Sequence, residues 1–264
     1  MIYFTGEDIE AMEFKINAAV GCNKGRVRRN NEDNLYFNGR ILPEEHEGIR
    51  HPARRNFYAD SEPFFCVFDG MGGEAKGEIA SYTAASVTEE YAKERNRYLE
   101  SPSDFLREVC AKANQAVCDA CDELEEGRMG STVVSLYFTA DEVYCCNMGD
   151  SRGFRYRDNT WQQLTKDHVE FQAPGSRHKP ALTQYFGVYP DEMTLVPYIA
   201  KGELKKGDVY IICSDGLTDM LSNIEICTVI RESASLRRCV EKLIMMANDK
   251  GGRDNITIII CRVE

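Results

Sequence analysis

The chain has 264 residues, of which 43% are hydrophobic and 28% are charged, as in an ordinary soluble globular protein. Its net charge of −11 at pH 7 disfavours nucleic acid as a partner, because phosphate binding needs a basic face. No apolar run approaches the roughly 20 residues that cross a membrane, so we also expect no membrane partner.

The eleven cysteines are an odd number scattered through apolar runs. This usage is typical of reduced, buried cysteine rather than of a disulfide framework. The chain begins MIYFTGEDIE, with acids where a signal peptide needs Lys or Arg. We therefore expect a cytoplasmic protein, and we expect it to act as a monomer.

The first predicted strand, over residues 13–21, leads into a charged loop over residues 22–38. In this loop Arg28 stands close to Glu32 and Asp33. Taken alone, such a run is more often a solvated loop than a site. A guanidinium group in this place could nonetheless bind an anionic ligand, because it matches phosphate oxygens bidentately.

Residues 39–63 are polar, contain three prolines and are expected to form an exposed insertion. The bulky run at residues 64–68, FFCVF, then predicts a strand buried on both faces. This strand ends at Asp69, which Gly70 follows. Because a carboxylate at the tip of a buried strand is costly unless a cation meets it, we expect Asp69 to bridge two divalent metal ions.

Two amphipathic helices are expected next, over residues 77–98 and from Pro102 onward, with Ser103 as the N-cap of the second. Cys118 and Cys121 form a C-x-x-C pair on the apolar face of the second helix. No second pair and no nearby histidine accompanies them, so a core role is favoured over zinc or redox chemistry. The two helices are expected to pack antiparallel on one sheet.

From residue 130 onward the pattern changes to short strands separated by turns, typical of an antiparallel meander. Asp150 follows one of these apolar strands in the sequence GDSR, and residues 169–191 are expected to be a loop-rich, flap-like lobe. A further strand, 208–213, runs into Asp215, and Asp254 precedes the final strand. The other expected elements are strands at 131–139, 142–148, 154–156, 161–164, 192–199 and 256–263, a capping box at 222–225, and a helix over 236–247.

Five acids thus lie at strand edges beside Gly or Asn. Any one of them alone is better explained as a turn former or cap. As a set of oxygen ligands without a His–Cys group, they favour Mg²⁺ or Mn²⁺ over zinc. Two such ions roughly 3.5–4 Å apart could hold a shared hydroxide for in-line attack at phosphorus. The five are Asp33, Asp69, Asp150, Asp215 and Asp254.

The same residues give the chain a resemblance to the metal-dependent protein serine/threonine phosphatases of type 2C, the PPM family. The motifs follow in the order of that family over nearly the whole chain, and the ordered set is far more specific than any one motif. They are Arg28-x-x-Asn31-Glu32-Asp33, Asp69-Gly-Met-Gly-Gly73, Gly130-Ser-Thr132, Gly149-Asp-Ser-Arg152, Leu164-Thr-x-Asp-His168, Ser214-Asp-Gly-Leu217 with Asp219, and Asp254-Asn255-x-Thr257.

The resemblance implies an α+β fold in which two antiparallel β-sheets form a sandwich flanked on both sides by antiparallel helix pairs. Because no linker is evident, residues 1–264 are expected to be a single catalytic domain. The implied activity is hydrolysis of phosphoserine and phosphothreonine in protein substrates of serine/threonine kinases. By this resemblance, water that bridges two Mn²⁺ or Mg²⁺ ions attacks phosphorus directly.

The resemblance also implies a role for each site residue. Asp69 would bridge both metals and Arg28 would hold the substrate phosphate. Asp150 matches the acid that helps to hold a weaker third ion in bacterial-type members. The remaining implied metal ligands are the backbone carbonyl of Gly70, Asp215 and Asp254 at one ion, and Glu32 and Asp33 at the other, directly or through water.

Three features depart from the family. Met71 stands where many eukaryotic members carry a histidine proposed to protonate the leaving group, so the DGMGG form is closer to the bacterial branch and no general acid can be named. The 169–191 lobe is short and irregular, and the 39–63 insertion is long.

Two other functions compete with this prediction. The stretch Gly70-x-Gly72-x-x-Ala75 imitates a dinucleotide fingerprint, although the chain lacks the βαβ alternation that this fingerprint requires. A catalytically inactive phosphatase-like module that binds phosphoproteins or partners is the more serious alternative, but it would be expected to have lost acids that are all present.

Overall fold

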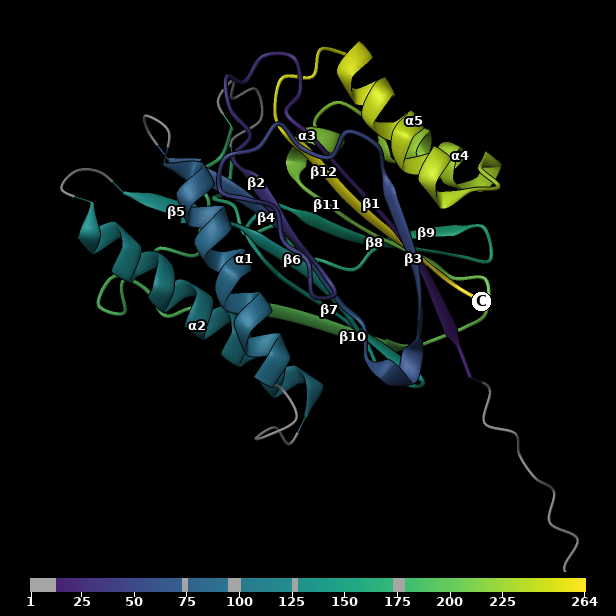
Figure 1. Ribbon diagram of the computed structural model, residues 1–264, viewed down its shortest axis with the longest axis horizontal. Coiled ribbons are helices and arrows are strands. Elements are labelled where there is room, and N and C mark those ends of the chain that lie inside the picture. Colours follow the sequence, from purple (N-terminus) through teal and green to yellow (C-terminus); the bar gives the residue numbers. More distant parts are fainter. Residues whose placement is uncertain (1–12, 73–75, 95–100, 125–127, 173–178) are drawn as a thin grey trace, which may run out of the picture.

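The computed structural model describes residues 13–72, 76–94, 101–124, 128–172 and 179–264. Two antiparallel β-sheets pack face to face, and helices cover the outer face of each sheet (Figure 1). The predicted α+β sandwich is therefore confirmed. The amino-terminal segment 1–12, Gly73 of the glycine-rich stretch, Ala75 and part of the predicted lobe, 173–178, lie outside the described residues.

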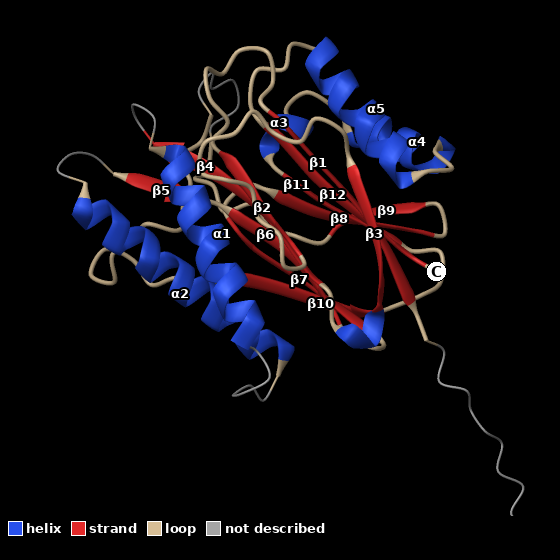
Figure 2. Ribbon diagram, in the orientation of Figure 1, coloured by secondary structure: helices blue, strands red, loops and turns tan. Residues whose placement is uncertain are grey.

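Both sheets are antiparallel throughout (Figure 2). The first has the strand order β3-β1-β12-β11-β8-β9, and the second has the order β10-β7-β6-β4-β2, with β5 paired to the end of β4. The first comprises β1 (Lys15–Asn23), β3 (Ala53–Tyr58), β8 (Arg152–Arg157), β9 (Thr160–Gln163), β11 (Val209–Cys213) and β12 (Ile256–Val263). The second comprises β2 (Asp33–Phe37), β4 (Phe64–Gly72), β5 (Met129–Ser131), β6 (Val133–Phe138), β7 (Glu142–Met148) and β10 (Tyr198–Glu203).

Helices α1 (Gly77–Glu94) and α2 (Pro102–Glu123) pack on the second sheet. Helices α3 (Asp215–Thr218), α4 (Asn223–Glu232) and α5 (Leu236–Asp249) pack on the first sheet. Figure 1 shows the two groups on opposite sides of the sandwich. Among the described residues, none of the helices has both the length and the apolar character that crossing a membrane demands.

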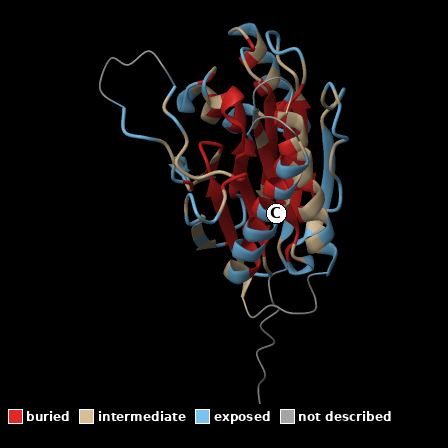
Figure 3. Ribbon diagram, turned by 90° about the vertical axis from the view of Figure 1, so that its left-hand side faces the viewer, coloured by how far each residue is buried: buried red, intermediate tan, exposed pale blue. Residues whose placement is uncertain are grey.

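Strand β4 shows why the sandwich forms. Phe64, Cys66 and Phe68 face the α1–α2 layer, whereas Phe65 and Val67 face the other sheet. The run FFCVF is thus buried on both faces, as predicted, because alternate side chains enter two different cores. The buried strands form the centre of the molecule in Figure 3.

The antiparallel sheets exclude the dinucleotide-binding alternative, since that fingerprint needs a parallel βαβ unit. The Cys118–Cys121 pair lies buried on the core face of α2, as predicted, and both thiols are free. The Ser222 capping box at the start of α4 is also confirmed.

The insertion is mostly exposed, as predicted, and it also contains strand β3 and a short 3-10 helix, because the polar residues of β3 pair with β1 at the sheet edge. Two local predictions were wrong. The N-cap of α2 is Ser101, whose side chain accepts from Asp104 N, since Pro102 itself takes the first helical position. The strand expected at 192–199 begins only at Tyr198, because the Val196 amide donates to Gln184 Oε1 instead of to a neighbouring strand.

Candidate metal centre

A cavity of about 380 Å³ brings together most of the predicted ligands. It lies where β4 ends and where β11 passes into α3. Six of the seven predicted metal-binding residues line it, together with Arg28 and Met71. The six are Glu32, Asp69, Gly70, Asp150, Asp215 and Asp254.

The backbone of Asp69 is held on both sides by Thr132. The Thr132 amide donates to the Asp69 carbonyl at 2.9 Å, and the Asp69 amide donates to Thr132 Oγ1 at 3.3 Å. The Thr132 hydroxyl also bonds to Ser151 Oγ at 2.7 Å, next to Asp150. The Gly-Ser-Thr and Gly-Asp-Ser-Arg motifs therefore fix where the two carboxylates enter the cavity.

Asp33 is the predicted ligand that does not line the cavity. It pairs with Asp69 across β2 and β4, but its Oδ2 accepts from Ser214 Oγ at 2.8 Å and from Thr257 Oγ1 at 2.7 Å. Ser214 follows β11 and Thr257 lies at the start of β12, and both strands belong to the first sheet, so Asp33 joins the two sheets. Asp33 is only 1% exposed, and because burial disfavours the charged form, it raises the pKa of the carboxyl group to about 7.

Close backbone approach places Glu32 beside Gly70. The Gly70 amide donates to the Glu32 carbonyl at 3.1 Å. A Cβ atom added at Gly77, the first residue of α1, would lie 2.9 Å from Glu32 Cδ and 3.0 Å from the Gly70 carbonyl oxygen. The carboxyl group and this carbonyl oxygen thus converge on one small space, which a side chain at position 77 would fill.

Asn255 anchors the loop that carries Arg28. Its Oδ1 accepts from the Glu32 amide at 2.8 Å, and its Nδ2 donates to the carbonyls of Lys24 at 2.8 Å and Asn30 at 3.1 Å. Because Asn255 follows Asp254 directly, the loop and this acid are held together.

Arg28 occupies the space between two predicted ligands. Its Nη1 lies 3.1 Å from Glu32 Oε2, and its Nη2 lies 2.7 Å from Asp254 Oδ2. The Arg28 side chain is 44% exposed at the mouth of the cavity. The guanidinium group is therefore within reach of both a ligand in the cavity and the carboxylates that line it.

The acids make the cavity strongly attractive to cations. Enclosure by protein raises the pKa of Asp69 well above its usual range, and the charges of Asp33, Asp254 and Asp150 raise it further. Burial also raises the pKa of Glu32. These carboxylates can be ionised together only where positive charge compensates them.

Sequence reasoning missed Lys179, which supplies part of that charge. Its Nζ lies 3.0 Å from Asp150 Oδ2 and also forms an ion pair with Asp215 Oδ2. Burial alone would lower the pKa of Lys179, but the nearby charges of Asp150 and Asp69 raise it overall. The motifs gave no signal for this residue, because it lies in the lobe whose path they do not specify.

The donor set fits hard divalent ions. Asp215 is 5% exposed, and its Oδ1 is buried without a hydrogen-bond partner among the described residues, as expected of an oxygen that binds a cation. Within the described residues no three His, Cys, Asp or Glu side chains stand close enough to enclose an ion. Instead, Arg28 and Lys179 pair with the carboxylates, so the acids are gathered but are held by cationic side chains.

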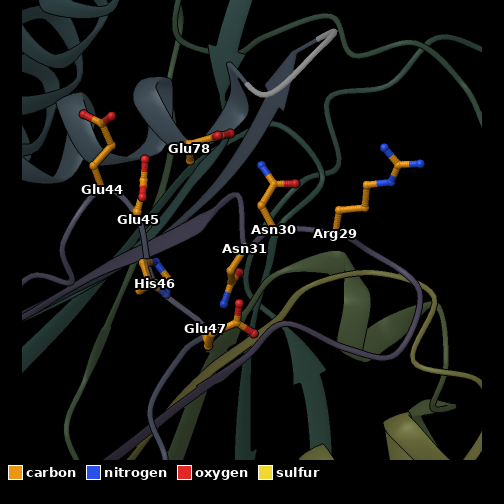
Figure 4. Close-up of a pocket in the computed structure, with 8 residues that line it drawn as sticks. All are labelled: Arg29, Asn30, Asn31, Glu44, Glu45, His46, Glu47 and Glu78. Carbon is orange, nitrogen blue, oxygen red and sulfur yellow. The ribbon is translucent and has the colours of Figure 1, made fainter.

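A larger cavity of about 820 Å³ is lined by residues 29–31 of the loop that carries Arg28 and by residues 44–47 of the insertion. Figure 4 shows the carboxylates of Glu44, Glu45 and Glu78 on one side and Arg29 on the other. Glu47, also in its wall, pairs with Lys24. The 39–63 insertion therefore forms one wall of a cavity next to the metal centre, although none of the predicted ligands lines it.

The structure is thus an α-β-β-α sandwich with an acidic cavity at the ends of β4 and β11. Residues 57–257, well over half of the chain, match the protein phosphatase 2C family. The chain belongs to that family, which confirms the resemblance drawn from the motifs.

Known proteins of the same kind cover almost the whole chain. A serine/threonine phosphatase stp from Listeria welshimeri is 29% identical over 93% of this chain and 95% of its own length. The solved S. agalactiae serine/threonine phosphatase is 25% identical with a TM-score of 0.75, covering 94% of this chain and 100% of that one. The catalytic domain of PstP, solved with 2 manganese ions, has the same fold, with a TM-score of 0.76, 24% identity and coverage of 95% and 99%.

Proposed function

We propose that this chain is a metal-dependent protein serine/threonine phosphatase that hydrolyses phosphoserine and phosphothreonine monoesters. The observation that carries the proposal is the convergence of six predicted ligands and Arg28 on one cavity. Membership of the phosphatase 2C family supports it, as do relatives named serine/threonine phosphatases. Every predicted acid is present, so no feature of the cavity favours the alternative of an inactive binding module.

We assign two Mn²⁺ or Mg²⁺ ions to this cavity. Asp69 would bridge them, with Asp215, Asp254 and the Gly70 carbonyl as further ligands. Glu32 and Asp33 would be ligands of the second ion, directly or through water. The Ser214 and Thr257 hydroxyl groups both donate to Asp33 Oδ2, so Oδ1 is the Asp33 oxygen that would serve as a ligand. Asp150 would be a ligand of a weaker third ion, at a position that Lys179 Nζ also reaches. The expectation of Mn²⁺ is supported by the catalytic domain of PstP, which was solved with 2 manganese ions.

The residues divide the work of phosphoryl transfer. When bound, divalent ions activate water and offset the charge of the phosphoryl group. Arg28 binds and orients the phosphate, because its planar guanidinium group matches two phosphate oxygens. Met71 lines the same cavity but cannot donate a proton, so protonation of the leaving group falls to water or to another group.

The physiological substrates would be proteins phosphorylated by serine/threonine kinases, and the enzyme would act as a cytoplasmic monomer in signalling. The 39–63 insertion and the 169–191 lobe border the cavity region and are the places where substrate choice could differ from that of relatives. Residues 1–264 would form one catalytic domain.

The direct test is hydrolysis of a phosphothreonine peptide with Mn²⁺, Mg²⁺ or excess EDTA. We expect activity with a divalent ion and none with EDTA. Absence of activity with every divalent ion, while the peptide still binds, would support the binding module instead.

Arg28→Ala tests the phosphate role. We expect KM for the peptide to rise more than the Mn²⁺ dissociation constant, because the variant loses a phosphate contact but no metal ligand. Arg26→Ala is the matched control, since Arg26 lies in the same loop but pairs with Asp249 at 2.8 Å, outside the cavity. A rise in the Mn²⁺ dissociation constant that exceeds the rise in KM would contradict the assignment.

A further inference from the structure

The lobe delivers a positive charge to the metal centre. Its base is pinned to the sheet, because the His168 amide donates to the Gly149 carbonyl at 3.0 Å. Its two arms are then joined, with the Thr183 amide donating to the His168 carbonyl at 2.8 Å and the Glu170 amide donating to the Ala181 carbonyl at 2.9 Å. The returning arm, with Lys179, therefore runs along the wall of the cavity.

Lys179 Nζ reaches two acids that come from different sheets. Asp150, which follows β7 of the second sheet, lies 3.0 Å away, and Asp215, which follows β11 of the first, pairs with the same ammonium group. Both residues are buried, at 8% and 5% exposure. Of the described residues that line this cavity, Arg28 is the other cationic one, and it pairs with different acids.

The two oxygens of Asp215 are in different situations. Oδ2 pairs with Lys179, whereas Oδ1 is buried and has no hydrogen-bond partner among the described residues. Asp215 can thus keep one oxygen for an ion deep in the cavity while the other stays on the ammonium group. Lys179 therefore competes with a metal ion for the position between Asp150 and Asp215, which we call the outer position. It leaves open the inner positions, which Asp215 Oδ1 faces.

We infer that the ammonium group of Lys179 takes the cation position between Asp150 and Asp215, in place of a third metal ion. This inference rests on the proposed function, since it assumes that two ions bind further in. A tethered ammonium group has an effective concentration on the order of millimolar, so it competes well with a weakly bound ion. A third ion can bind there only when the returning arm moves Lys179 away.

The test is to count bound Mn²⁺ by equilibrium dialysis over a range of free Mn²⁺, with isothermal titration calorimetry as a second readout. The variant is Lys179→Met, which keeps the length of the side chain and removes its charge. The control is Lys206→Met, an exposed lysine before β11, at the end of that strand opposite Asp215. The second variant, Lys179→Met with Asp150→Asn, removes the acid that belongs only to the outer position.

We expect two ions in the wild type and in Lys206→Met, and a third in Lys179→Met. This third ion should bind at least about tenfold more tightly than any third ion in the wild type, because a unit charge at contact distance is removed. Adding Asp150→Asn should abolish the gain.

Two ions in both wild type and Lys179→Met, with the same affinities, would overturn the inference and leave the proposed function intact. A gain that persists in the double variant would also overturn it, because the effect would then belong to the inner ions. No Mn²⁺ binding by any of the proteins would contradict the proposed function and this inference together.

Discussion

Gly77 gives the sharpest test of how the Glu32 side of the centre is built. A methyl group at this position would lie 2.9 Å from Glu32 Cδ and 3.0 Å from the carbonyl carbon and oxygen of Gly70. To restore an ordinary contact of 3.4 Å, the carboxyl group must retreat by 3.4 − 2.9, or about 0.5 Å. Metal–ligand distances tolerate only about 0.2 Å. Gly77→Ala should therefore weaken Mn²⁺ binding about 10- to 100-fold, as changes beside a ligand do.

The assay is an Mn²⁺ titration by calorimetry, repeated as the Mn²⁺ dependence of peptide hydrolysis. Overpacking against Glu32 and the Gly70 backbone should reduce the free energy of unfolding by about 1–3 kcal/mol, so urea unfolding is used to check that the variant stays folded. Gly202→Ala is the control, because its nearest neighbour, Arg155 Nη1, is at an ordinary 3.7 Å. Superimposable Mn²⁺ titrations for Gly77→Ala and wild type would refute the reasoning.

Two further predictions concern stability, measured by urea unfolding without added metal. Ser214→Ala removes one of the two hydroxyl groups on buried Asp33 and should lower the free energy of unfolding by about 1–3 kcal/mol. Ser86→Ala, whose buried hydroxyl has no partner among the described residues, should be neutral or stabilising, and equal losses for the two would contradict this account. Arg157→Ala removes the cationic partner of Asp208, which is 1% exposed and accepts from Arg157 Nε at 2.6 Å, and leaves it hydrogen bonds from the Lys205 amide and the Tyr210 hydroxyl. We expect a loss of about 3 kcal/mol, and a loss below 1 kcal/mol would show that the buried pair matters little.

Sequence reasoning found the parts of the fold that rest on local patterns. The apolar run of β4 and the capping box of α4 carry their own signals, and the structure confirms both. Strand β3 has the sequence ARRNFY and is mostly exposed, so no apolar alternation marks it. Its place at the edge of the sheet depends on pairing with β1, which the sequence of β3 alone does not reveal.

The candidate site shows the same division. The acids that end or precede buried strands could be predicted, since those strands and turns fix where such residues lie. Asp33 does not line the cavity, because Ser214 and Thr257 of the other sheet donate to its carboxylate. This contact could not be predicted from the sequence, because it depends on how the two sheets pack. The sequence did not indicate Lys179 and Gly77 as site residues for the same reason. Their roles depend on neighbours that are distant in the sequence, Asp150 for Lys179 and Glu32 for Gly77.

Asp69→Asn is the measurement that tests the central claim most directly. The amide keeps the shape of the side chain but removes the charge proposed to bridge two ions. We predict that Mn²⁺ binding at micromolar concentrations and hydrolysis of a phosphothreonine peptide are lost together, with rates at least about 100-fold below wild type. Wild-type hydrolysis by Asp69→Asn, or hydrolysis by the wild type that survives excess EDTA, would contradict the two-metal mechanism.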